Sequence, residues 1–290
     1  MKVSSDIITS KQYRQVLRFF DCTNYIYLDQ IKNVQFNKIS GYKKSKDIFN
    51  RIYGDFIVID KMLNEKELLN SATLLRKVYE DIIYIIVTSY DNKFVVTIDS
   101  KPSEFRRILK NHCVDIFGDG ITPDFFDYIY EYLCKIIHPC SLKELISHIY
   151  ANPINRKYVL NSIRFMMLTI EYIYLSFINN NNNVDNTLNE SIWAMCWLVN
   201  LFNSIRYYHH SKKSMRIVKK YLINDIESKY INRVNTENTD FAKYVQNNPK
   251  EFEDIRDGII ERVQKEIKRS KYNDDVDLIL RGRKEELNGK

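Results

Sequence analysis

Arg76, Glu80 and His138 are the first residues in this chain whose types and spacing suit chemistry on a phosphate. Arg76 and Glu80 are four positions apart in a largely apolar segment, so on a helix they share one face. His138 precedes Pro139, where we expect a helix to end and its negative pole to favour the imidazolium form. An arginine that holds a phosphate and a histidine that moves a proton suffice for RNA cleavage without a metal.

Two interpretations of these three residues are open. In the functional one, Arg76 holds the scissile phosphate, Glu80 orients it, and His138 is the acid–base for attack by the 2′-hydroxyl. In the structural one, an ion pair within one helix offsets the cost of partly buried charge, and the histidine caps a helix end. Residue chemistry alone favours the structural interpretation.

A basic segment, residues 206–220, suits a nucleic-acid backbone. It carries six Lys or Arg, two histidines and two tyrosines, and no acid. Cationic side chains beside aromatic rings match phosphates and stacked bases, although the solvated outer face of a surface helix explains the same composition. The predicted nucleic-acid-binding residues are Arg206, His209, His210, Lys212, Lys213, Arg216 and Lys220.

The pattern LLRxxxE at 74–80, followed by a helix that ends in YLxxxxHP at 132–139, resembles the HEPN superfamily, closest to poorly characterised bacterial branches. The resemblance covers roughly residues 48–150. It implies an α-helical bundle, often a homodimer, and Arg76, Glu80 and His138 as the matching polar positions. Members include ribonucleases of toxin–antitoxin and antiviral defence systems, and others that only bind nucleotides or a partner protein.

Arg107 and His112 are secondary candidates. The nuclease motif of the superfamily is an arginine, four to six residues and a histidine; Arg107 leaves four residues before His112, and Arg106 leaves five. Active members usually have a polar residue after the arginine, whereas Ile108 is apolar. This departure favours a surface or capping role for the pair.

Composition restricts the fold. The 290 residues are 44% hydrophobic and 28% charged, with only 7 glycines and 5 prolines. Few glycines disfavour nucleotide-binding α/β folds and β-sandwiches, which need tight turns. We therefore predict an all-α fold, an irregular multi-helix bundle with long helices and little or no sheet. The net charge of +7 is a mild excess for a chain of this size.

The expected compartment is the cytoplasm, because no apolar leader opens the chain and no apolar stretch is long enough to span a membrane. The five cysteines form no CxxC pair, which indicates free thiols. Among zinc-type ligands, His112 and Cys113 are neighbours whose helical side chains diverge, so we expect neither a metal nor another cofactor.

Hydrophobic periodicity predicts the elements that position these residues. Strands are predicted only within 24–39, and residues 179–183, all asparagine, are predicted to form a loop. Asn64 and Ser103 are predicted helix caps. Helices are predicted over 11–20, 48–63, from 64 to about 90, 104–117, 124–137, 141–150, 153–178 and 189–208, with shorter segments beyond 212.

The expected organisation is an N-terminal segment (1–60) of mixed structure, a HEPN-like helical core (61–225) and a charged helical C-terminal extension (226–290). The leading hypothesis is a protein of a bacterial defence or toxin system that binds RNA, with metal-independent cleavage less favoured than binding. Other partners in this hypothesis are an antitoxin or partner protein and a second copy of the chain. The alternative is a non-catalytic helical scaffold or regulatory subunit that binds a partner protein.

Overall fold

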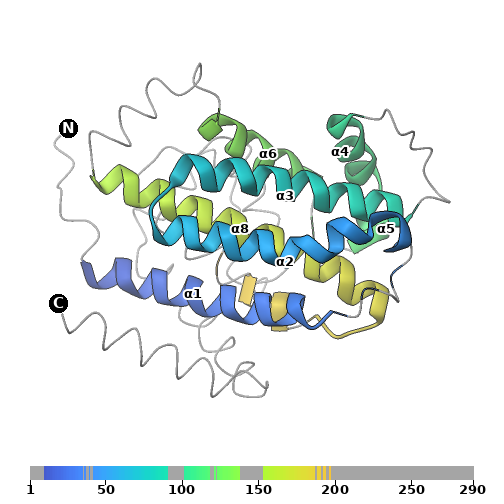
Figure 1. Ribbon diagram of the computed structural model, residues 1–290, viewed down its shortest axis with the longest axis horizontal. Coiled ribbons are helices and arrows are strands. Elements are labelled where there is room, and N and C mark those ends of the chain that lie inside the picture. Colours follow the sequence, from blue (N-terminus) through green and yellow to red (C-terminus); the bar gives the residue numbers. More distant parts are fainter. Residues whose placement is uncertain are drawn as a thin grey trace, which may run out of the picture. The chain divides into compact units, whose positions relative to one another are not determined.

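The computed structural model describes residues 10–34, 36, 39, 42–90, 101–117, 121, 123–137, 153–186, 188–190, 192, 193 and 196. Regular secondary structure in these ranges is helical and includes no strand, so the all-α prediction is confirmed. The helices, labelled in Figure 1, are α1 (Ser10–Lys32), α2 (Tyr42–Asn64), α3 (Leu68–Ser89), α4 (Pro102–Asn111), α5 (Cys113–Phe117), α6 (Pro123–Ile137) and α8 (Pro153–Asn182).

The chain divides into two compact units, one of residues 27–186 and one of residues 1–26 together with 187–290. The unit of residues 27–186 contains α2 to α6, α8 and the charged residues of α2, α3, α4 and α6 that are described below. In the other unit, Cys196 Sγ donates a hydrogen bond to Thr23 Oγ1 at 3.5 Å, and both residues are buried.

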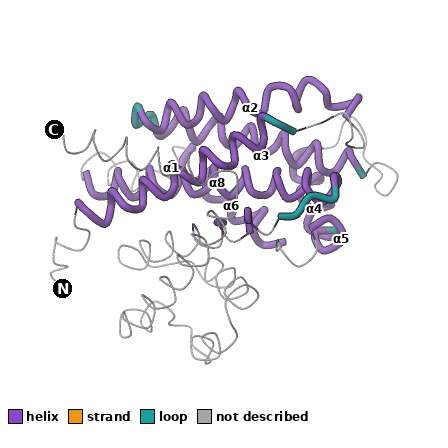
Figure 2. The backbone as a smooth tube through the Cα atoms, turned by 90° about the horizontal axis from the view of Figure 1, so that it is seen from below, coloured by secondary structure: helices purple, strands orange, loops and turns teal. Residues whose placement is uncertain are grey.

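Helix α3 is the centre of the unit of residues 27–186, because it packs against α2, α4, α6 and α8. Figure 2 shows α2 and α3 running alongside one another. Helical periodicity predicts that one stripe of α3 faces inward, and each of its members is buried: Leu68, Leu75, Val78, Ile82, Ile85 and Ile86. The same periodicity gives a stripe on α2 that is buried at Ile52, Phe56, Ile59 and Leu63, whereas Ile48 is half-buried.

The predicted strands within 24–39 are wrong for the part that the structure describes. Helix α1 is one continuous helix from Ser10 to Lys32, longer than the predicted helix over 11–20. Its buried residues Phe20, Thr23, Tyr27 and Ile31 recur every three or four positions. That spacing places the four residues on one helical face. The loose alternation of apolar residues over 24–39, from which strands were predicted, is a weaker signal than this helical repeat.

The predicted loop at the asparagine run is also wrong, because α8 continues to Asn182. Asn183 adopts a left-handed conformation with a φ of 53°. Its backbone N–H reaches the Asn180 carbonyl at 3.5 Å, and the Val184 N–H reaches the Asn179 carbonyl at 2.9 Å, which closes the helix with a Schellman motif. Asparagine tolerates this conformation better than most residues, so the run ends the helix rather than interrupting it.

Two predicted caps are displaced. Asn64 is the last residue of α2, and α3 starts at Leu68 after Glu67. Helix α4 starts at Pro102 rather than after Ser103, and the Glu104 carboxylate accepts the Lys101 N–H at 3.1 Å. Proline suits the first helical position because its missing N–H has no helical partner there. The predicted segment over 104–117 is two helices, α4 and α5, whereas α6 matches its prediction within one residue.

The predicted helix over 141–150 and the part of 189–208 beyond residue 196 lie outside the described residues. The described positions 188–190, 192, 193 and 196 are helical. Across the described ranges, no helix is long and apolar enough to cross a membrane.

Helix α8 buries a carboxyl group. Every side chain from position 159 to 179 is buried, including Glu171, which is 0% exposed. Neither oxygen of Glu171 accepts a hydrogen bond from any described residue. Burial, together with the nearby charge of Asp60, raises the pKa of Glu171 well above 4.5, the usual value for a glutamate. Burial therefore favours the protonated, neutral form of this carboxyl over the carboxylate.

Replacing this carboxyl should change the pH dependence of stability. In the wild type, the unfolded state releases its proton as the pH rises through about 4.5, while the folded state keeps it, so stability falls with rising pH. Glu171→Gln should therefore gain stability relative to the wild type as the pH rises, by about 1.4 kcal/mol for each pH unit over which only the unfolded wild type is deprotonated, and the gain should fade toward pH 4. Urea unfolding across this range measures the gain, and Glu65→Gln on the exposed surface is the control. A gain independent of pH would contradict a buried neutral acid.

Candidate functional site

Helix α3 presents two rows of charge, each made of residues four positions apart. Arg76 and Glu80 form one row, and Arg76 Nε lies 3.2 Å from Glu80 Oε1, as their spacing predicts. Their side chains are 24% and 28% exposed. Lys77 and Asp81 form the other row, offset by one residue and therefore by about 100° around the helix.

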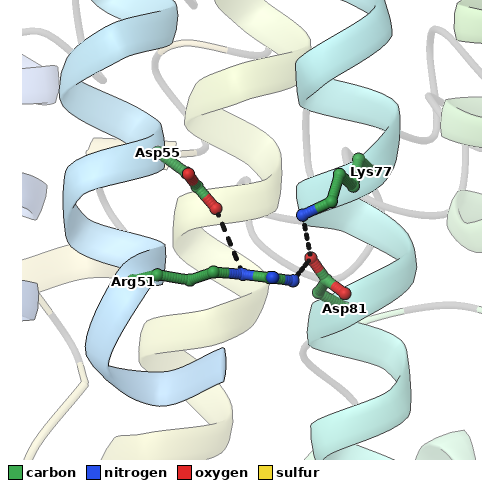
Figure 3. Close-up of polar contacts among 4 residues, drawn as sticks. All are labelled: Arg51, Asp55, Lys77 and Asp81. Carbon is green, nitrogen blue, oxygen red and sulfur yellow. Dashed lines mark hydrogen bonds and ion pairs between the residues drawn. The ribbon is translucent and has the colours of Figure 1, made fainter. Parts of the chain in front are cut away.

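The Lys77–Asp81 row belongs to a network that joins α3 to α2, shown in Figure 3. Arg51 of α2 pairs with Asp81, and its Nε lies 3.5 Å from Asp55 Oδ2. Lys77 Nζ lies 3.3 Å from the same oxygen of Asp81. Two cations face two anions, so this network leaves no excess charge for a ligand, and its role is to hold α2 against α3.

The Arg76 row faces α6 instead. Arg76 Nη2 donates a hydrogen bond to the Tyr130 hydroxyl at 3.0 Å, and Arg76 Cζ lies 4.9 Å from the centre of the Tyr130 ring. Arg106 of α4 lies over the same ring with its Cζ 3.4 Å from the centre. Three helices thus bring two guanidinium groups to one aromatic ring. We call Arg76, Arg106 and Tyr130 the arginine–tyrosine cluster.

Arg106 has unmet hydrogen-bonding capacity. Its Nε and Nη1 atoms are buried, and neither finds an acceptor in the part of the chain that the structure describes. Buried donors normally have partners, because an unmet one costs about 1–3 kcal/mol. A guanidinium stays charged at any physiological pH. Arg106 therefore offers a fixed positive charge and buried donors without a matching acid.

The acids near the cluster already have cationic partners. Glu80 pairs with Arg76, and Asp127 of α6 pairs with Lys110 of α4. In the contacts described around the cluster, the three cations Arg76, Arg106 and Lys110 face the two carboxylates Glu80 and Asp127, an excess of one positive charge within this part of the chain. The cluster therefore differs from the balanced network of Figure 3, and an anion is the ligand that this excess suits.

Tyr79 anchors the helices around the cluster. Its side chain is fully buried, and its hydroxyl donates to the Phe126 carbonyl, which joins α3 to α6. Burial raises the pKa of Tyr79 well above its usual value, so the hydroxyl keeps its proton. Burial lowers the pKa of Arg76. The nearby Cys134, Tyr130 and Glu80 raise it by more, so the pKa of Arg76 lies above the usual value for an arginine. These contacts hold Arg76 as a permanent cation.

Of the other predicted site residues, the structure describes only Arg107 and His112, and neither is part of this cluster. Arg107 is exposed, and His112, directly after α4, has its Nδ1 3.2 Å from Asp115 Oδ2. His138 lies outside the described residues, as does the whole predicted nucleic-acid-binding set: Arg206, His209, His210, Lys212, Lys213, Arg216 and Lys220. The structure therefore places Arg76 and Glu80 together and shows nothing of how His138 relates to them.

Sequence reasoning missed Arg106 and Tyr130 as partners of Arg76. The signal was present in α4, where Phe105 and Leu109 are buried. Arg106 follows Phe105 by about 100° around the helix and stays near the buried face, whereas Arg107 follows it by about 200° and points to solvent. The contact to Tyr130 had no local signal, because Tyr130 is 54 positions from Arg76.

A metal has no described ligand set here. Cys113 is buried and its thiol donates to the Ile121 carbonyl at 3.0 Å. Within the described ranges, no group of three or more His, Cys, Asp or Glu side chains could hold a metal ion.

Comparison with known proteins adds no assignment to this geometry. No protein-family model matches the chain, and no curated protein or solved structure matches it significantly. Arguments about function therefore start from the arginine–tyrosine cluster.

Two variants of Tyr130 separate the contributions of its hydroxyl and its ring to stability. Tyr130→Phe loses the hydrogen bond from Arg76 and should cost about 1 kcal/mol. Tyr130→Leu also removes the ring beneath Arg106 and should cost roughly 1–2 kcal/mol more, the range of a partly desolvated cation–π contact. Urea unfolding midpoints measure both variants. Equal losses would mean that the ring contact to Arg106 contributes nothing to stability.

Proposed function

We propose that this protein binds RNA through its phosphate groups and that the arginine–tyrosine cluster is one point of contact. The observation that supports this proposal is the state of Arg106, a stacked guanidinium whose buried donors lack an acceptor among the described residues. Arginine is well suited to phosphate, since its planar fork of donors matches phosphate oxygens. Stacking on Tyr130 restricts the plane of that fork before a ligand arrives.

The case for RNA, rather than for an unspecified anion, comes from the sequence. The basic segment of residues 206–220 supplies more cations for a phosphate backbone, and the chain carries an excess of +7. The resemblance to the HEPN superfamily favours RNA over DNA and favours a bacterial antiviral defence or toxin–antitoxin system as the setting. A partner or antitoxin protein and a homodimer belong to the same proposal.

Glu80 sets a condition on binding. Its carboxylate accepts from Arg76 Nε and repels a phosphate brought to the same guanidinium. A phosphate at the cluster must therefore rely first on Arg106, whose donors are unmet, and share Arg76 with Glu80. Because Arg76 and Glu80 are each about one quarter exposed, this side of the cluster is accessible to a ligand.

Binding should depend on Arg106 more than on an arginine of the balanced network. Arg106→Gln removes the excess charge and should weaken binding of a labelled single-stranded RNA about tenfold, the loss of one charged hydrogen bond. The dependence of log affinity on log salt should also become shallower by about one phosphate contact. Fluorescence anisotropy over a salt series measures both quantities.

Arg51→Gln is the matched control for this experiment, because Arg51 is an arginine of the same unit that already has two acidic partners. Its RNA affinity should stay within about twofold of the wild type, which is within 0.5 kcal/mol. Equal losses in both variants would show that the cluster is not a specific contact. No binding even at low salt would favour the non-catalytic helical scaffold.

Cleavage is a separate part of the proposal and depends on His138. If His138 acts as the acid–base for attack by the 2′-hydroxyl, cleavage of total RNA should proceed in EDTA and fall at least about 100-fold in His138→Ala. Gel electrophoresis of RNA fragments over time measures the rate. If His138→Ala leaves cleavage unchanged and His112→Ala abolishes it, the active site would be the Arg107–His112 pair.

A further inference from the structure

We infer that the arginine–tyrosine cluster recognises a terminal phosphate of RNA, a phosphate monoester, rather than phosphodiesters within the strand. This inference rests on the proposed function, since it names the part of the RNA that the same site takes. It follows from three features: the burial of the Arg106 donors, the covered ring of Tyr130 and the accessible side at Arg76.

The burial of the Arg106 donors restricts the ligand. Nε and Nη1 are each almost completely shielded from solvent, so an acceptor must reach below the surface to meet them. An internal phosphodiester has a ribose on each side, so the RNA strand must pass the site in both directions. A terminal monoester has one ribose and three free oxygens, so it can reach inward end-on while the rest of the RNA stays outside.

Arg106 covers one face of the Tyr130 ring, so no base can stack on that face. The Arg106 guanidinium lies 3.4 Å from the ring centre, and Arg76 binds the hydroxyl of the same ring. Sequence-tolerant sites for single strands normally use exposed aromatic faces on which successive bases stack. This face of Tyr130 is already occupied by a guanidinium, so the cluster suits a phosphate and offers that face to no nucleobase.

The accessible side at Arg76 supplies the path. Arg76 and Glu80 are partly exposed, whereas the Arg106 donors are not. A terminal phosphate approaching from this side can meet the exposed part of Arg76, while Nε and Nη1 of Arg106 lie below the surface. Its three free oxygens can accept from both guanidiniums, which a phosphodiester with two free oxygens does less well.

The test compares three versions of one short RNA, with hydroxyl at both ends, with a 5′-phosphate only and with a 3′-phosphate only, each with and without inorganic phosphate. Competition against a labelled RNA with the wild-type protein gives the six affinities. One phosphorylated end should bind about five- to tenfold more tightly than the hydroxyl form, and inorganic phosphate at millimolar concentration should reduce that advantage. The end whose phosphate increases the affinity is the end of the RNA that lies at the cluster.

Variants assign the effect to the cluster. Arg106→Gln should abolish the advantage of the phosphorylated end, while Arg51→Gln keeps it. Equal binding of all RNA forms by the wild type would overturn terminal recognition and leave the proposed function intact. No binding of any RNA would overturn both. An advantage that survives in Arg106→Gln would place terminal recognition elsewhere, which also overturns this inference.

Discussion

The burial of one face of α3 is the constraint on which the rest of the unit of residues 27–186 depends. Leu75, Val78 and Ile82 are almost completely buried, and the helix contacts α2, α4, α6 and α8. Apolar burial on this scale dominates the free energy of folding, so it determines how α3 is rotated. Once the rotation is determined, Arg76 and Glu80 must face α6, and Lys77 and Asp81 must face α2. The charged rows follow from the core rather than from their own attraction.

The two charged rows then meet different neighbours. Toward α2, Arg51 completes a balanced network at the surface, where ion pairs contribute at most about 1 kcal/mol each. Toward α6, a second arginine, Arg106 of α4, stacks on the ring of Tyr130, and no acid among the described residues pairs with it. Burying the Arg106 donors without acceptors among the described residues lowers the stability of the folded state. A ligand that completes the set of hydrogen bonds would offset such a cost.

The sequence predicted what local periodicity determines. The inward stripe of α3 and the pairing of Arg76 with Glu80 require only the helical repeat, and both are found. The contact of Arg106 with Tyr130 could not be predicted, because it depends on how α4 and α6 pack against α3. The asparagine run was wrongly predicted as a loop from its composition, and the segment over 24–39 was wrongly predicted to hold strands from its loose alternation. In the structure, the spacing of buried residues continues α1, and the left-handed Asn183 closes α8 after Asn182.

The central claim is that the guanidinium of Arg106 meets phosphate oxygens. Nitrogen-15 NMR of the arginine Nε–H groups tests it directly, with the Arg106 signal assigned from its loss in Arg106→Gln. During titration with a phosphorylated RNA, the account predicts a downfield shift and slower solvent exchange for Arg106, with the Arg51 signal unchanged. A titration in which the RNA binds while the Arg106 signal stays in place would contradict the account.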